Sequence, residues 1–156
     1  MKLTKQDLAI LKLLQSDASL STTNIAEQLN MSQSPCWRRI NQIGQAGLIK
    51  KRVALLDRQS LGMNVVVFAN INLTPEGLQN LKAFEQEMRL HSEIVECYTM
   101  AGIWDYVIKV VTRDIGHYEA FLRNHLTVNP AIRELHSHIA VTEIKNSTEL
   151  PLDTQL

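Results

Sequence analysis

The sequence predicts an α+β fold, with a helix-turn-helix domain over residues 1–60 and a ferredoxin-like βαββαβ domain over residues 61–156. Up to Gly47, apolar residues recur at helical spacing behind residues that favour helix starts. From Met63 onward, segments that alternate apolar and polar residues take turns with helical segments, which indicates strands and helices in one sheet-based domain. The charge divides at the same place: residues 1–60 carry nine Lys and Arg against four Asp and Glu, and residues 61–156 carry seven against twelve.

This division gives the first domain a net charge of +5 and the second −5, so the first domain suits a polyanion. No apolar run approaches the roughly 20 residues that span a bilayer, and the N-terminus lacks the apolar core of a secretory signal. Cys36 and Cys97 stand far apart without a CxxC pair, which fits free thiols in a reducing compartment. We therefore expect a cytoplasmic protein without membrane segments or cofactors.

The first domain begins with a helix whose start is marked by Thr4 and Asp7. The Thr4 hydroxyl can accept a first-turn N–H, and the Asp7 carboxylate favours the positive end of the helix. The apolar stripe of this helix consists of Leu8, Ile10, Leu11 and Leu14. Ser21 then caps a short second helix. Its buried face consists of Ile25, Ala26 and Leu29.

A third helix follows after the very short turn Asn30-Met31. Ser32 can cap this helix, and Pro35 is tolerated because first-turn N–H groups have no helical partner. Gly47 supplies the stop. The predicted buried face consists of Cys36, Ile40 and Ile43. Two helices separated by so short a turn, in a three-helix unit, are typical of a helix-turn-helix.

The outward face of the third helix is polar and carries no acidic residue. Its residues are Gln33, Ser34, Trp37, Arg38, Asn41 and Gln42. Arginine can grip guanine or phosphate with two N–H groups, and Gln and Asn can pair with adenine, so this chemistry suits duplex DNA. Downstream, Lys50, Lys51 and Arg52 add cations on a short wing or linker strand that could meet the DNA backbone. The alternative structural interpretation is a solvated helix face beside a charged loop.

Two residues of this helix have open assignments. Trp37 can stack on DNA or form part of the core of the domain. Arg39 follows Arg38 and is rotated by about 100° around the helix, so it either contacts DNA or pairs within the protein.

The sequence of the second domain predicts, in order, a strand, a helix, two strands, a helix and a strand. The expected strands are Met63–Leu73, Ile94–Met100, Tyr106–Val111 and a last one within Ile132–Ile144. Pro75 opens the first helix, whose predicted apolar stripe is Leu78, Leu81, Phe84 and Met88. The second helix is expected from about Ile115 to Leu126, burying Tyr118, Phe121 and Leu122. Helices that cover one sheet face leave the other face, with its Val, Phe and Tyr side chains, to bind a second copy of the chain.

We predict no metal site and no catalytic residue. His136 and His138 project from the same strand face, but sequence spacing places no third ligand, so surface or interface histidines are the better interpretation. No phosphate-binding glycine loop, nucleophile elbow or zinc signature occurs in the sequence. Asp105 and His136 could form an acid–base pair in an enzyme of this fold, although the sequence does not bring them together.

Six strings of residues, taken in order, resemble the leucine-responsive regulator/asparagine-operon regulator family (Lrp/AsnC, the feast/famine regulators). They are Asp7–Leu14, Ile25–Ser32, Cys36–Ile40, Gly47–Ile49, Ala101–Tyr106 and Ile144-Lys145. The resemblance covers essentially the whole chain. The strings Ser34–Arg39 and Val53–Asp57 also look like a subgroup linked to cysteine detoxification.

The resemblance implies that the helix from Ser32 to Ile43 reads the DNA major groove. It also implies that the second domain dimerises through its sheets and often assembles dimers into tetramers or octamers. Effector amino acids of the family bind between dimers, near a Gly-x-x-Asp-Tyr turn. The residues implied at this site are Met100, Ala101, Gly102, Asp105, Tyr106 and Ser137. Gly102 would let a ligand approach the backbone, and Asp105 could receive an α-ammonium group, whereas the alternative is a tight turn whose Asp binds turn N–H groups.

The function that we expect is that of a sequence-specific DNA-binding transcription regulator. A small metabolite, an amino acid by the resemblance, would modulate its assembly or its DNA affinity. The alternatives are a regulator that responds to no ligand, a ferredoxin-like small-molecule enzyme, and a ligand-binding or scaffolding protein whose helical domain contacts protein. Strong salt dependence of duplex binding would separate the DNA-binding interpretations from the last, because phosphate contacts release counterions.

Overall fold

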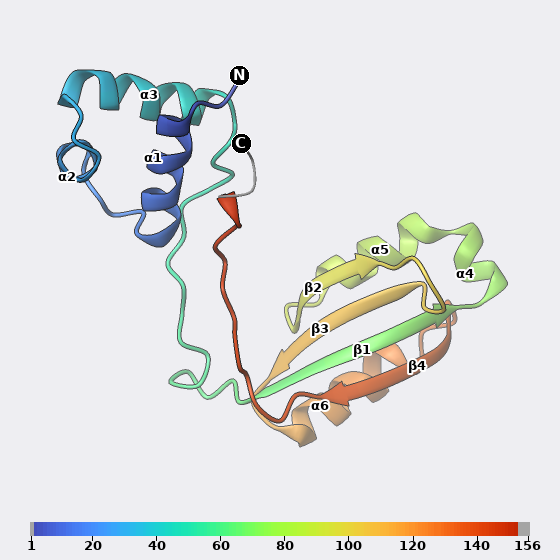
Figure 1. Cartoon of the computed structure of the whole chain (residues 1–156). Helices are drawn as coiled ribbons and strands as arrows, with labels where there is room; N and C mark the ends of the chain where they lie inside the picture. Colours follow the sequence, from blue (N-terminus) through green and yellow to red (C-terminus); the bar gives the residue numbers. More distant parts are fainter. Residues whose placement is uncertain (1, 153–156) are drawn as a thin grey trace. The chain divides into compact units, whose positions relative to one another are not determined.

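In the computed structural model of the chain, three helices form the N-terminal part (Figure 1). They are α1 (Lys5–Ser16), α2 (Thr22–Gln28) and α3 (Gln33–Gln45). Thr4 and Asp7 form a capping box on α1, in which the Asp7 amide donates to Thr4 Oγ1 at 3.2 Å and the Thr4 amide donates to Asp7 Oδ2 at 2.8 Å. Ser21 and Asn24 form a second box at the start of α2. The two predicted helix starts are therefore confirmed.

The third helix also begins and ends where the sequence predicts. Ser32 is its N-cap residue, although its side chain makes no capping hydrogen bond, and Pro35 lies in the first turn. Gly47 follows the helix with φ 69°, in the left-handed region that glycine adopts without steric cost. The buried cluster of the three helices consists of Ile10, Leu14, Ile25, Ala26, Cys36 and Ile43. These residues lie on the faces that the helical spacing predicts, so the unit closes around its own core.

The segment that follows this unit differs from the prediction. Residues 48–57 lie in neither helix nor strand, so the expected linker strand is not formed in this structure. A strand requires hydrogen bonds from a neighbouring strand, and the four strands within residues 2–152 pair only with one another. The basic segment Lys50–Arg52 is therefore an exposed, irregular stretch of chain.

Four antiparallel strands form the sheet of the second half (Figure 1). They are β1 (Val65–Leu73), β2 (Ile94–Thr99), β3 (Tyr106–Thr112) and β4 (Ile132–Ile139). Their spatial order is β2-β3-β1-β4, so the first and third strands lie in the middle and the βαββαβ prediction is confirmed.

The helices of this half are more broken than predicted. They are α4 (Pro75–Gln79), α5 (Leu81–Leu90), α6 (Ile115–Phe121) and the π-helix η1 (Leu122–Leu126). Asn80 has φ −131° and ψ 51°, outside the helical region, and it separates α4 from α5. No single helical register runs through this break, so Leu78 and Leu81 are exposed while Phe84 and Met88 are buried. The prediction that all four residues share one buried stripe is wrong.

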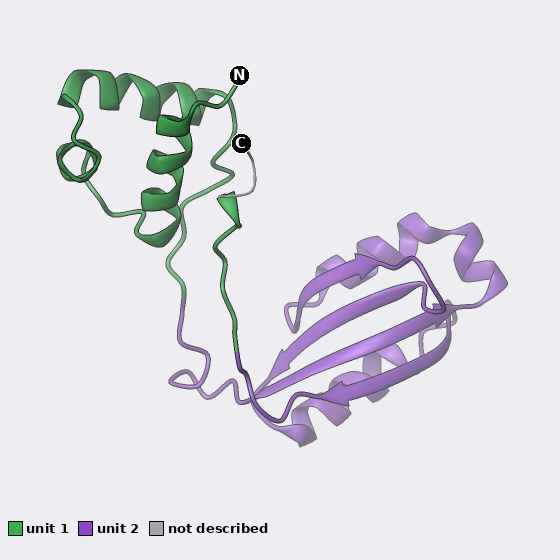
Figure 2. Ribbon diagram, viewed as in Figure 1, with its two compact units in different colours: residues 1–55, 145–156 green, residues 56–144 purple. Residues whose placement is uncertain are grey.

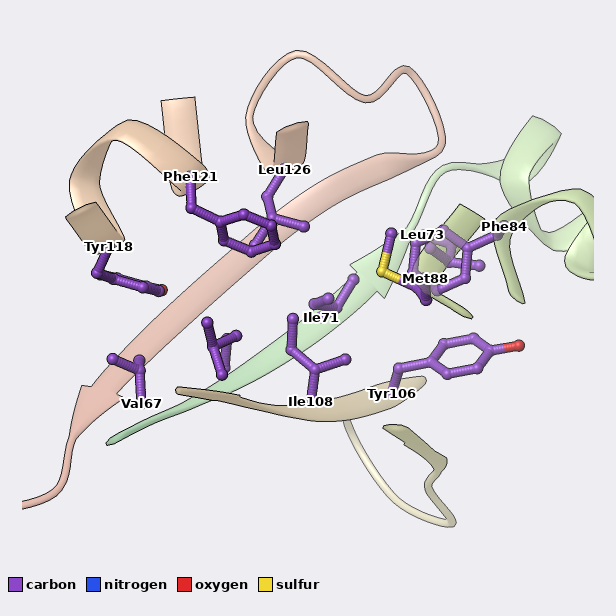
Figure 3. Packing of buried hydrophobic residues seen from close by; sticks show 12 residues of the cluster. Val67, Ile71, Leu73, Phe84, Met88, Tyr106, Ile108, Tyr118, Phe121 and Leu126 are labelled. Carbon is purple, nitrogen blue, oxygen red and sulfur yellow. The ribbon is translucent and has the colours of Figure 1, made fainter. Parts of the chain in front are cut away.

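The core of the sheet lies on the face covered by α5 and α6 (Figure 3). Alternate residues of the central strands meet the helices there, as the period of two requires. Val67, Ala69, Ile71 and Leu73 come from β1, and Tyr106, Ile108 and Val110 come from β3. The opposite face carries Phe68, Asn70, Val107, Lys109, Tyr98, His136 and His138. Phe68 and Tyr98 are exposed on that face, which no helix of the described chain covers.

The structure describes residues 2–152, which divide into two units (Figure 2). One unit contains the chain up to Leu55 together with the stretch from Lys145 onward, and the other is Leu56–Ile144. Residue 1 and residues 153–156, which fall at the outer ends of the two predicted domains, lie outside the described residues. Gln15 binds the returning C-terminal stretch, because its amide donates to the Leu150 carbonyl at 3.1 Å and its oxygen accepts from the Leu150 amide at 3.0 Å. None of the helices described is both long and apolar enough to cross a membrane.

Candidate nucleic-acid interface and ligand turn

The outward face of α3 is exposed as predicted. Trp37 has 60% of its surface exposed, which favours a contact role over the core role that the sequence left open. Ser32, Gln33, Ser34, Arg38 and Gln42 are exposed, and Asn41 is half-buried. This face therefore offers an indole, a guanidinium and several amide and hydroxyl groups, with no carboxylate among the residues of α3.

The opposite face of α3 holds the helix in place. Cys36 and Ile43 are fully buried, and Ile40 packs against the same cluster. Burial raises the pKa of the Cys36 thiol, so this cysteine is a small core residue and not a reactive thiolate. Gln33 Nε2 donates to Thr23 Oγ1 at 2.8 Å, which links the start of α3 to α2.

Arg39, which we expected either at the DNA or in an internal pair, forms the internal pair. Its Nη1 donates to Asp7 Oδ1 at 2.9 Å and to Thr4 Oγ1 at 3.1 Å. The Asp7 side chain is 1% exposed and that of Arg39 is 29% exposed. Burial pushes the pKa of the Asp7 carboxyl upward, but hydrogen bonds from Thr4 and Arg39 outweigh it and hold the pKa below its usual value. The pair fixes α3 to the first turn of α1, 32 residues away in the chain.

The four cations between residues 48 and 60 divide into two groups. Lys50, Lys51 and Arg52 are exposed and lie in the first unit. Arg58 belongs to the second unit, where its Nη1 donates to the Met63 carbonyl at 3.0 Å and its Nη2 lies 3.7 Å from Glu143 Oε2. The free basic segment is thus Lys50–Arg52.

The turn between β2 and β3 is closed by backbone bonds. The Met100 amide donates to the Asp105 carbonyl at 2.9 Å, and the Asp105 amide donates to the Ile71 carbonyl at 3.0 Å. The Asp105 carboxylate accepts from the Leu73 amide through Oδ2 at 2.8 Å. Gly102 adopts φ 142°, which a residue with a Cβ rarely adopts. Met100, Ala101, Gly102 and Ile103 at the tip are exposed.

Two of the six residues implied at the effector site are not at the tip of this turn. They are Tyr106 and Ser137, which lie on the helix-covered face of the sheet. Tyr106 is 2% exposed; its hydroxyl donates to Glu85 Oε1 at 3.0 Å, and its ring packs 4.9 Å from Phe84. Burial and the Glu85 carboxylate raise the pKa of Tyr106 to about 12. Ser137 pairs with Ala69 across β4 and β1, and its hydroxyl is hydrogen-bonded to the Tyr118 hydroxyl. Within a single chain, Ser137 is thus on the helix-covered face.

Sequence reasoning missed one residue of β1 that holds the turn. Asn72 Oδ1 accepts from the Asp105 amide at 3.0 Å, so this buried side chain helps to hold the turn. The two residues are 33 positions apart, and no local pattern points to their contact. The Trp104 side chain packs against β4, where the centroid of its ring lies 4.9 Å from that of the His136 ring. Residues 2–152 place no group of three or more His, Cys, Asp or Glu side chains that could hold a metal ion.

Comparisons with known proteins match both halves of the chain. Residues 3–50 match a family described as winged helix-turn-helix DNA-binding, and residues 66–150 match the Lrp/AsnC ligand binding domain. The chain is 34% identical to transcriptional regulator AzlB of Bacillus subtilis over 151 residues, which cover 97% of this chain and 96% of that protein.

Two crystal structures are similar over nearly the full length. An AsnC family transcriptional regulator from Agrobacterium tumefaciens is 38% identical, with a TM-score of 0.93 over 99% of this chain and 100% of that one. A transcriptional regulator from Neisseria meningitidis in complex with L-Met is 27% identical, again with a TM-score of 0.93 and the same coverage.

Proposed function

The chain belongs to the Lrp/AsnC family of transcriptional regulators, and from this membership we propose a division of labour between its two units. The face of α3 reads DNA, and the turn from Met100 to Asp105 receives a small amino acid that modulates assembly or DNA affinity. The observation that carries the proposal is the exposed, acid-free face of α3 beside the basic segment Lys50–Arg52. The chain acts in the cytoplasm and catalyses no reaction.

The residues of the DNA interface have different roles. Arg38, Asn41 and Gln42 reach base edges, because guanidinium and amide groups match the donor and acceptor pattern of the major groove. Trp37 packs on the sugar–phosphate backbone or a base. Phosphates are bound by Ser32, Gln33, Ser34, Lys50, Lys51 and Arg52. Arg39 acts through Asp7 and Thr4 as a positioning residue that fixes the angle of α3.

A dimer places two such readers on one duplex. The sheet face that carries Phe68 and Tyr98 is exposed and apolar in part, so it is the surface through which two chains pair. Two copies of α3 related by a two-fold axis enter successive major grooves about 34–36 Å apart, and the binding sites are therefore close to palindromic. Dimers then assemble into tetramers or octamers.

The ligand acts at the tip of the β2–β3 turn. The L-Met complex of the Neisseria relative supports an amino acid as the ligand class. Asp105 receives the ammonium group, Gly102 gives access to backbone amides, and Met100 and Ala101 line the approach. Tyr106, which follows this turn, is held on the helix-covered face by Glu85, and Ser137 lies on the same face, hydrogen-bonded to Tyr118. A ligand can shift assembly or DNA affinity only by its differential affinity for the two states, typically about 1–3 kcal/mol.

The first test selects a duplex from a random pool and measures its binding by fluorescence anisotropy at several salt concentrations. Arg38→Ala should weaken binding to the selected site by about 1–3 kcal/mol and relax the preference at one base position. Lys51→Ala should weaken binding to all sequences alike and reduce the salt slope by about 0.9. The matched control is Arg123→Ala, which removes an exposed arginine from the other unit and should leave both quantities unchanged. Equal binding by wild type and Arg38→Ala would remove Arg38 from the base-reading residues.

A further inference from the structure

A cavity of about 660 Å³ lies in the second unit, away from the 100–105 turn. Its walls come from the start of β2, the end of β3, α6 and η1. The turn joins the end of β2 to the start of β3, so the cavity and the turn lie at opposite ends of this hairpin. The length of β3 separates them by about 20 Å at roughly 3.3 Å per residue. The volume lies within the range of about 300–1,000 Å³ that is usual for small-molecule sites.

The charged groups of the cavity can bind both ends of an amino acid or a simple carboxylate. Arg113 at the end of β3 and Glu93 before β2 both line it. Their strands are neighbours there, because the Val111 amide donates to the Glu93 carbonyl at 2.9 Å. Across the described chain, neither side chain forms an ion pair, so the Arg113 guanidinium keeps its planar set of donors for a carboxylate.

A buried polar atom beside this cavity has no partner among the described residues. His91 Nε2 is shielded from solvent and makes no hydrogen bond there. The His91 ring packs edge-on against Phe121 at 5.3 Å and lies 4.6 Å from the ring of His125. Phe121 and His125 both line the cavity. A buried nitrogen without a partner is costly, and such groups recur at functional sites or beside an ordered water.

The local helix geometry brings polar side chains to the same wall. The chain changes from α-helix to π-helix at Leu122, and the π-helical turn supplies Asn124 and His125 to the cavity. Short π-helical turns are rare in proteins, but those that do occur are often found at functional sites. The apolar part of the wall is formed by Met63, Val95, Val111, Ala120 and Phe121, and the other lining residues are Ser92, Thr112 and His117.

We propose that this cavity is a second ligand site that binds a small aliphatic carboxylate. Arg113 and Asn124 hold the carboxylate, and His125, whose ring lies against that of His91, supplies a further polar contact. The aliphatic body packs on Val95, Val111 and Phe121, and Glu93 accepts the ammonium group when the ligand is an amino acid. The proposal is independent of the ligand role of the 100–105 turn.

Calorimetric titration of the full chain with L-leucine and with 4-methylpentanoate tests this site. The two probes share the branched body and the carboxylate and differ in the ammonium group. Arg113→Gln should weaken binding about tenfold or more, because a hydrogen bond to a charged group contributes about 1.5–3 kcal/mol. The control Arg133→Gln, at an exposed position of β4, should bind like wild type. Binding of either probe that Arg113→Gln weakens and Arg133→Gln does not supports the site, and the pattern across the two probes identifies which acids it accepts.

Histidine side-chain resonances in NMR spectra then locate the probe. Those of His91 and His125 should shift on binding, whereas those of His136 and His138 on the opposite sheet face should not. The proposal is overturned if neither probe binds at millimolar concentration. It is also overturned if binding is lost in Asp105→Ala and kept in Arg113→Gln, and that second result would support the turn as the only ligand site.

Discussion

Removal of Arg39 should destabilise the N-terminal unit without removing a DNA contact. Arg39→Ala leaves the nearly buried Asp7 carboxylate with its bonds from the Thr4 hydroxyl at 2.6 Å and the Thr4 amide at 2.8 Å, but without its cation. Breaking a fully buried pair costs about 3–5 kcal/mol, and an exposed pair contributes at most about 1 kcal/mol. Because Asp7 is 1% exposed and Arg39 is 29% exposed, we expect an intermediate loss of about 2 kcal/mol.

Urea unfolding followed by tryptophan fluorescence measures this loss. The chain has two tryptophans, so a Trp104→Phe background leaves Trp37 to report on the first unit. With a slope of about 1–3 kcal/mol/M, the midpoint should fall by about 1 M. Arg38→Ala is a matched control one residue away, because the side chain removed is exposed, and its free energy of unfolding should change by less than about 0.5 kcal/mol.

Two outcomes would contradict this reasoning. The first is an equal loss of stability in Arg38→Ala and Arg39→Ala. The second is an Arg39→Ala effect that persists undiminished in an Asp7→Ala background, because two side chains in contact should show a coupling of about 0.5–3 kcal/mol. Acid titration gives an independent check, since the pKa of Asp7 is lowered in the folded state from 3.8. Its contribution is therefore fully present above pH 3.8 and is lost as the pH falls through the lower folded pKa, and this acid loss should be smaller in Arg39→Ala.

Three further predictions concern the sheet unit. The pKa of Tyr106 is raised to about 12, so its contribution to stability is present below about pH 10 and is lost as the pH rises toward 12; alkaline unfolding of Tyr106→Phe should show a smaller loss. Asp105→Ala should lose about 1–3 kcal/mol with the Leu73 amide unpaired, and by anisotropy it should keep DNA binding but not respond to an amino acid; an unaltered response would make the turn structural only. Gly102→Ala should cost about 1–3 kcal/mol in thermal unfolding because of its φ of 142°, and no cost would mean that the turn relaxes freely.

The sequence predicts best those features that depend on neighbours in the chain. The capping boxes join Thr4 to Asp7 and Ser21 to Asn24, which are three positions apart, so the starts of α1 and α2 follow from local chemistry. The strand alternation from Val65 to Leu73 likewise follows from a period of two, because one face meets the helices.

Features that depend on distant partners could not be predicted in this way. The choice of Arg39 between DNA and Asp7 depends on a contact across 32 residues. The face on which Ser137 lies depends on its register with Ala69, and a shift of one residue would reverse it. The tight packing of α4 likewise depends on a distant segment, because a Cβ on Gly77 would lie 2.7 Å from the Ala131 carbonyl oxygen.

The two interpretations of Asp105, a turn residue and a ligand residue, are compatible in the structure. One carboxylate oxygen accepts from the Leu73 amide, and an ionised carboxylate has about four acceptor positions in all. An ammonium group can therefore bind the same side chain without releasing the turn. Leu73 ends β1 and precedes Thr74, which caps α4 and donates its amide to the Ala131 carbonyl at 2.9 Å. A ligand bound to Asp105 thus acts on a connected set of hydrogen bonds. This set runs from the turn through the end of β1 to the start of β4. Asp105→Asn separates the two roles, because the amide oxygen can still accept from Leu73 while the charge that attracts an ammonium group is gone.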